Sequence, residues 1–192
     1  MAWSGVGSDG PAWGRIREKV VGDLQLDDAR GFWKDLAAPA FEEYWQVYQD
    51  DSKPDVKALL LLYRRLLCAA LLLNHLADKV APYHQLAKGI GFMDLIQKHD
   101  PVAGADLHAC RHFSNDAKHS MKGLQEATTR KRDPNFDRPG SSEIFEIFGV
   151  FHDGAHADLC RAVCGAWRFW IGYFEGSTAI NFHQYLAVRP IP

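Results

Sequence analysis

One segment of this 192-residue chain concentrates the side chains that could transfer protons, donate hydrogen bonds or bind a metal. In the stretch 101–124 they recur every three or four residues: His108, His112, Asn115 and His119. At about 100° per residue, this spacing places them on one face of a helix. The solvent face of an amphipathic helix ordinarily carries varied charges, whereas this one carries three imidazoles and an amide. Because imidazole changes charge near neutral pH, the face has the chemistry of an acid–base or ligand site.

Basic residues flank one edge of this polar face, and the opposite face is apolar. The basic residues are Arg111, Lys118 and Lys122. The apolar face is expected to pack in the core through Cys110, Phe113, Ala117, Met121 and Leu124. A plain solvent-exposed helix is the simpler interpretation, since nine of the 192 residues are histidine.

The segment S-N-D-A-K-H, from Ser114 to His119, resembles the signature of the HEPN superfamily. That signature is an Arg, a following polar residue and a His a few residues later on a helix. Asn115 matches the polar position and His119 matches the histidine, whereas Ser114 stands at the position of the Arg. The nearest arginine, Arg111, lies about one turn earlier. The resemblance extends over the helical part of the chain from about residue 53 to residue 174.

This resemblance implies metal-independent cleavage of RNA by two copies of the motif that face each other in a homodimer. His119 would act as acid or base at the ribose 2′-hydroxyl, with Asn115 and Arg111 beside the phosphate. Lys118, Lys122 and His112 would contribute to binding, and no cofactor is implied. Without the arginine clamp at the motif position, a domain that binds a nucleic acid, a nucleotide or a protein without cleaving is favoured over an intact ribonuclease.

A second basic cluster lies in the polar segment 125–142. This segment contains two prolines and a glycine, so it is expected to form a long loop. Its cations are Arg130, Lys131 and Arg132, which could form a local phosphate-binding patch. Any such patch must be local, because 22 basic and 24 acidic residues leave a net charge of −2.

A metal site is the alternative interpretation of the histidines. His108 and His112 are four residues apart, the spacing at which two imidazoles of one helix can share an ion. The third ligand would be His119 or His75. This pattern resembles metal-binding helical bundles of the DinB type. For His75 alone, a hydrogen-bonded core histidine is the simpler interpretation.

An interaction protein without catalysis is the third class that the composition allows. The chain has six Trp, six Tyr and eleven Phe. Four of the tryptophans could line a homodimer surface or a partner groove, or could form an aromatic core: Trp33, Trp45, Trp167 and Trp170. Walker, Gly-rich phosphate-loop and Ser-His-Asp motifs are absent from the sequence, which argues against NTPase, kinase, Rossmann and hydrolase classes.

The hydrophobic periodicity predicts a mainly α, single-domain bundle of five to six helices, with a small β element near 144–151. Residues 1–10 are expected to be flexible, the bundle to span 11–176 and the tail 177–192 to be extended. The helices are expected to begin and end near the following positions: a first helix from Pro11, a second from Asp27 or Asp28 with a kink at Pro39, a third over 54–80 capped by Ser52, a fourth over 83–98, a fifth over 100–124 and a last over 155–174.

The sequence predicts a cytoplasmic protein. It has four cysteines without a CxxC pair, and they are expected to be buried free thiols: Cys68, Cys110, Cys160 and Cys164. The beginning of the chain does not resemble a signal peptide. The apolar run 58–73 is shorter than the ~20 residues that span a bilayer and contains Arg64 and Arg65. At least one of these arginines must leave the core or pair with a carboxylate such as Glu42 or Glu43.

Overall fold

The computed structural model describes residues 26–119, 127–150 and 156–176. Several predictions concern positions outside these ranges: the flexible residues 1–10, the helix from Pro11, the tail 177–192, and the side chains Met121, Lys122 and Leu124.

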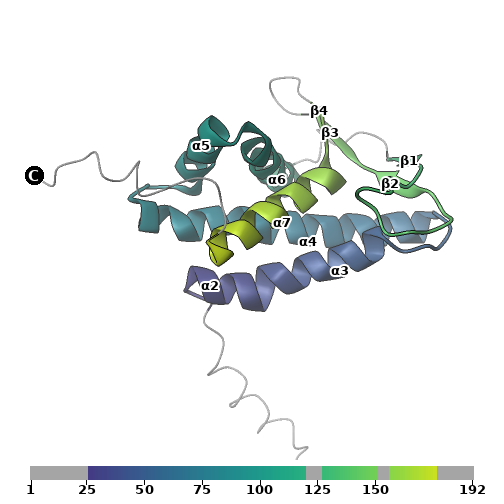
Figure 1. The fold of residues 1–192 in the computed structure, drawn as a ribbon, viewed down its shortest axis with the longest axis horizontal. Helices are drawn as coiled ribbons and strands as arrows, with labels where there is room; N and C mark the ends of the chain where they lie inside the picture. Colours follow the sequence, from purple (N-terminus) through teal and green to yellow (C-terminus); the bar gives the residue numbers. More distant parts are fainter. Residues whose placement is uncertain (1–25, 120–126, 151–155, 177–192) are drawn as a thin grey trace, which may run out of the picture.

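The described chain is mainly helical, with two small antiparallel sheets (Figure 1). The elements are α2 (Ala29–Phe32), the π-helical turn η1 (Trp33–Ala37), α3 (Ala38–Tyr48), α4 (Val56–Val80), the 3-10 turn η2 (Ala81–His84), α5 (Gly89–His99), α6 (Pro101–His119), β1 (Thr128–Arg130), β2 (Ile144–Glu146), β3 (Phe148–Val150), β4 (His156–Asp158) and α7 (Leu159–Glu175). With α2, η1 and α3 counted as one continuous helix, the described body has five helices. The prediction of a mainly α bundle is confirmed.

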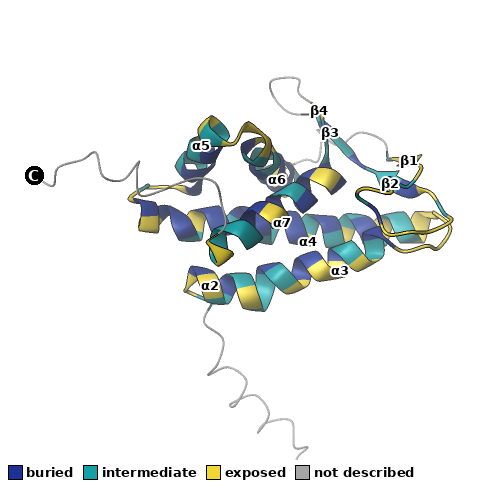
Figure 2. Cartoon of the chain, in the orientation of Figure 1, coloured by how far each residue is buried: buried dark blue, intermediate teal, exposed yellow. Residues whose placement is uncertain are grey.

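Helix α4 is the centre of the body. It contacts α3, α5, α6 and α7, and Figure 2 shows buried residues along α4 and α7 where the two helices cross. Its N-cap is Asp55, whose carboxylate accepts a hydrogen bond from the backbone of Ala58 at 2.7 Å. Ser52 was predicted as the cap; it lies outside the helix and its hydroxyl donates to Asp50 instead. The helix ends where Pro82 was expected to stop it, in the turn η2.

The kink predicted at Pro39 takes the form of a π-helical turn. Asp28 caps α2 by accepting from the backbone of Gly31 at 3.0 Å. Because proline has no N–H, Pro39 cannot donate to the carbonyl four residues earlier, and the backbone widens into η1 directly before it.

The predicted β element near 144–151 is confirmed as the two strands β2 and β3, and each of them pairs with a strand that was not predicted. β1 lies inside the segment expected to be a loop and pairs with β2, and β3 pairs with β4. β4 occupies the first residues of the predicted last helix, so α7 begins only at Leu159, capped by the carboxylate of Asp158. Strands of three residues have too little periodicity to be separated from loop or helix in a sequence.

Two further expectations concern single side chains. Arg65 forms the expected ion pair with Glu43. The prediction of four buried thiols is wrong for Cys68, which is exposed on α4, whereas the three other cysteines are buried. Among the described helices, none combines the length and the apolar character needed to cross a membrane.

Candidate functional site

The polar face of α6 is the first candidate site. Arg111, His112 and Asn115 are half-buried, and Lys118 and His119 are exposed in the last turn. Since α6 is an unbroken helix over these positions, it holds the predicted residues on one edge, as the spacing requires. Within the described parts of the chain, neither Arg111 nor Lys118 forms an ion pair.

His108 is tied to the neighbouring helix. Its Nε2 lies 3.3 Å from Oδ1 of Asp94 on α5. Burial lowers the pKa of His108, and the carboxylate of Asp94 opposes that shift. The rings of His108 and His112 have centroids 6.5 Å apart. His108 therefore takes part in the contact between α5 and α6. Of the histidines on the polar face, it is the one that stabilises helix packing.

Ser114, at the arginine position of the HEPN signature, faces the core. It is fully buried, and its hydroxyl donates to the backbone carbonyl of Cys110 at 2.7 Å. An arginine at this position could not reach the polar edge without leaving the core. The cations that the described part of this edge does present are Arg111 and Lys118.

The histidines of the alternative metal site do not converge. His75 lies 3.7 Å from the carboxylate of Asp78, one turn further along α4, and His108 faces Asp94. Among the described residues there is no group of three or more His, Cys, Asp or Glu side chains placed to hold a metal ion.

Two of the three cations predicted to form a local phosphate-binding patch, Arg130 and Arg132, form contacts within the fold, which leaves less free charge for such a patch. Arg130 forms an ion pair with Asp137 and donates to the hydroxyl of Tyr48 at 2.9 Å. Its guanidinium is also 3.4 Å from a carboxylate oxygen of Glu146. The charge of Arg130 is therefore largely neutralised by carboxylates within the fold.

The side chain of Arg132 is likewise engaged by hydrogen bonds within the fold. Its guanidinium donates to the backbone carbonyls of Ser142, Asp50 and Gln49 at 3.1–3.3 Å, and only 8% of its side chain is exposed. Of the three cations, Lys131 is the exposed one.

Asp137 organises this segment although sequence reasoning did not single it out. It is fully buried and accepts hydrogen bonds from Arg130, from the amide of Gln49 and from the backbone of Asp133. Burial raises the pKa of Asp137, but these hydrogen bonds outweigh it and hold the pKa below its ordinary value. The sequence offered only a weak signal for this pair, because Asp137 is one of two acids among the seven residues that follow Arg130.

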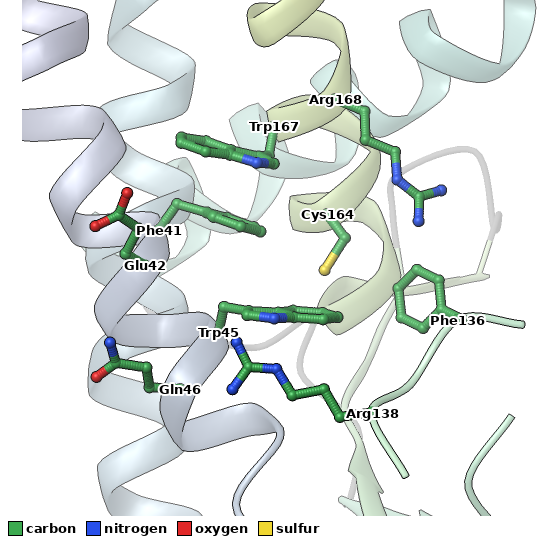
Figure 3. Close-up of a pocket in the computed structure, with 9 residues that line it drawn as sticks. All are labelled: Phe41, Glu42, Trp45, Gln46, Phe136, Arg138, Cys164, Trp167 and Arg168. Atoms are coloured by element: carbon green, nitrogen blue, oxygen red, sulfur yellow. The ribbon is translucent and has the colours of Figure 1, made fainter. Parts of the chain in front are cut away.

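The second candidate site is a pocket of about 510 Å³ between α3, α7 and the 136–138 segment (Figure 3). Of the four tryptophans considered above, Trp170 is fully buried in the core, while Trp45 and Trp167 line the pocket. The complete lining is Phe41, Glu42, Trp45, Gln46, Phe136, Arg138, Cys164, Trp167 and Arg168.

The aromatic walls of the pocket are ordered by stacking. Phe41 stacks on Trp167 with centroids 4.2 Å apart and planes 7° apart, and it is within 14° of parallel to Trp45. The two indoles are therefore close to parallel to each other. Phe136 meets Trp45 edge-on at 5.9 Å. The tryptophans were visible in the sequence as candidates for a groove, but Phe136, Arg138 and Arg168 carried no pattern that linked them to it.

Comparison with protein-family models, with curated proteins and with solved structures finds no significant match in any of the three.

Proposed function

We propose that this chain is a HEPN-like helical protein that binds RNA along the polar edge of α6, as a homodimer, and cleaves it weakly or not at all. The observation that supports binding is the positive charge of Arg111 and Lys118 beside Asn115 and His119, since neither cation forms an ion pair with another described residue. In a chain of net charge −2, such a local group of cations provides the attraction for phosphates that the whole molecule lacks.

The residue types fit contacts to a nucleic-acid backbone. Arg111 and Lys118 are seven residues apart, two turns of one helix, so both can face the same ligand. A guanidinium binds a phosphate through two parallel hydrogen bonds, and a lysine ammonium adds a point charge. Asn115 lies between them on the same edge, with an amide that donates or accepts.

Weak or absent cleavage follows from the position of Ser114. A metal-independent ribonuclease needs acid–base groups and a fixed cation on the phosphate. His119 is the one residue on this edge proposed as acid or base, and the residue at the motif's arginine position points into the core. In a homodimer, His119 of the second copy would supply the other acid–base group.

The binding part is tested by fluorescence anisotropy with a labelled single-stranded RNA in EDTA. The double variant Arg111→Gln, Lys118→Gln is expected to bind at least tenfold more weakly. Its plot of log K against log salt should also be shallower, by roughly 0.7 for each cation removed. The matched control is Lys57→Gln, Arg64→Gln, an exposed pair with the same seven-residue spacing on α4. Equal losses in the two double variants, or no binding by the unchanged protein, would overturn the proposal.

The cleavage part uses the same RNA and the same buffer. The expected result is intact RNA, or slow cleavage that His119→Ala abolishes. Rapid cleavage that survives in His119→Ala would contradict the role proposed for this histidine. Sedimentation velocity of the unchanged protein tests the homodimer, which a monomer at micromolar concentration would refute.

A further inference from the structure

We infer that the pocket between α3 and α7 binds a planar aromatic ligand that carries an anionic group, a carboxylate or a phosphate, and is no larger than a mononucleotide. This inference is independent of the RNA-binding proposal, because no residue of the α6 edge lines the pocket. It rests on the aromatic walls, on the two arginines at the rim and on the size of the cavity.

The volume and lining fit a small molecule. Ligand pockets commonly have volumes of roughly 300–1,000 Å³ and combine apolar or aromatic walls with a few polar groups. This pocket has about 510 Å³. Figure 3 shows Trp167, Phe41 and Trp45 as successive near-parallel rings, with Cys164 beside them and Phe136 further to the right.

The parallel rings favour a flat ligand. Aromatic groups gain most from offset-stacked or edge-to-face contacts, and Trp45 and Phe136 present a face and an edge to each other at 85°. A planar ring placed against Trp45 would continue the stacking order that Phe41 and Trp167 already show. An aliphatic ligand would gain the burial but not this stacking.

The cations favour an anion. Arg138 and Arg168 line the pocket and are exposed, and among the described residues neither forms an ion pair. Arg168 lies over Phe136 at 5.3 Å from the ring centroid, and it also acts electrostatically on Asp106. Arg161, on the same ring at 5.0 Å, is by contrast paired with Asp133.

Glu42, the one acidic residue that lines the pocket, favours one orientation of the ligand's anionic group. Glu42 is exposed on α3, and Figure 3 shows it across the pocket from Arg168. An anionic group is attracted to Arg138 and Arg168 and repelled by Glu42, so it should lie toward the arginines and away from Glu42. Glu42→Gln is therefore expected to strengthen the binding of an anion, which an adventitious apolar contact would not show.

The thiol in the pocket is unreactive. Burial raises the pKa of Cys164 to about 12, although the hydroxyl of Tyr44 partly opposes this shift. The thiol therefore stays protonated and neutral near pH 7, and it contributes surface rather than a nucleophile. The site is accordingly assigned to reversible binding.

The test is calorimetric titration of the full chain with two matched pairs of probes. One pair is indole-3-acetate and its neutral amide, and the other is AMP and adenosine. At least one anion is expected to bind in the micromolar range, tenfold or more tightly than its neutral partner. The pair that shows the preference tells whether the anionic group is a carboxylate or a phosphate. No binding of either anion at millimolar concentration, or equal binding of anion and neutral partner, would overturn the inference.

Variants assign the binding to this pocket. Arg138→Gln with Arg168→Gln is expected to remove the preference for the anion, a loss of tenfold or more, while the neutral partner is unaffected. Trp45→Leu should weaken both probes, with thermal melting to verify that the half-buried position tolerates the change. Arg64→Gln, an exposed arginine on α4, is the control. If the arginine variants and this control bind alike, the ligand is held elsewhere and the inference fails.

Discussion

Arg130 and Asp137 form an ion pair that is almost withdrawn from water. The side chains are 13% and 0% exposed, and Tyr48, Gln49 and Glu146 complete their surroundings. A buried pair contributes little by itself, because desolvation offsets the attraction, but the loss of one partner leaves a charge without compensation. The pair therefore fixes the 127–146 hairpin against α3 and makes that hairpin sensitive to a single substitution.

Asp137→Ala is expected to lower the free energy of unfolding by about 3 kcal/mol, since it removes the main partner of the largely buried Arg130 guanidinium and leaves only the longer contact with Glu146. Urea denaturation at pH 7 measures this loss. The control is Asp27→Ala, which removes an exposed carboxylate and is expected to change stability by less than about 0.5 kcal/mol. Similar values for the two variants would show that the pair is not formed.

The pH dependence of this contribution has a definite sign. The native pKa of Asp137 is lowered, so its stabilisation is fully present above the unfolded value of about 3.9. It is lost as the pH falls through the lower native pKa.

At the scale of elements, the crossing of α5 and α6 depends on Gly104. A Cβ at this position would lie 2.2 Å from Cα of Gln97, in the backbone of the opposing helix, so the two helices would have to separate. Gly91 on α5 has room for a side chain, because a Cβ added there would meet nothing closer than a side-chain carbon of Leu86 at 4.0 Å. Both glycines lie within helices, and only their surroundings differ.

Gly104→Ala and Gly91→Ala are expected to change stability in opposite directions. The first should destabilise by roughly 1–3 kcal/mol through overpacking, and the second should stabilise by up to about 1 kcal/mol through helix propensity. Thermal and urea denaturation of the two variants test this. Stabilisation by Gly104→Ala would refute the close approach of α5 and α6.

At the scale of the whole molecule, Asp106 makes stability depend on pH. It lies between α6 and α7, where its Oδ2 would be 1.7 Å from a Cβ at Gly165. Burial, with a smaller contribution from Asp100, raises the pKa of Asp106 to about 7, and Arg168 opposes the shift. The native state therefore retains a proton that the unfolded chain releases near pH 4. Its contribution to stability falls as the pH rises from about 4 to about 7.

Asp106→Asn is expected to raise the free energy of unfolding at pH 7 by roughly 1–2 kcal/mol, a value reduced for the partial exposure of the carboxyl group. The gain should become small at pH 4, where the native group is protonated and the unfolded group is about half protonated. Urea denaturation at pH 4, 5.5 and 7 gives the profile. Asp116→Asn, on the same helix, is the control, and a parallel profile for wild type and Asp106→Asn would contradict the prediction.

The local sequence pattern was sufficient to predict the long helices and to place the polar residues of α6 on one edge. The run from Val56 to Val80 and the face of α6 are visible in the sequence because helical periodicity repeats over many residues, and proline and acidic caps mark their ends within a turn. The edge of Arg111 and His119 follows from the same rule. The choice of Asp55 over Ser52 as cap was missed, since both are competent residues and only backbone geometry distinguishes them.

Tertiary structure alone decided which charges are free and where the pocket lies. In the sequence, Arg130 and Arg132 could not be distinguished from the free cations of a surface patch. In the structure, their partners are Asp137, Gln49 and Asp51, and Gln49 lies 83 positions from Arg132 in the sequence. The pocket likewise joins Trp45, Phe136 and Arg168 from three separate segments. Hydrophobic periodicity and capping are local properties that a sequence displays directly. The pairing of charges and the shape of a cavity depend on which distant segments meet, and only the packing of the helices determines that.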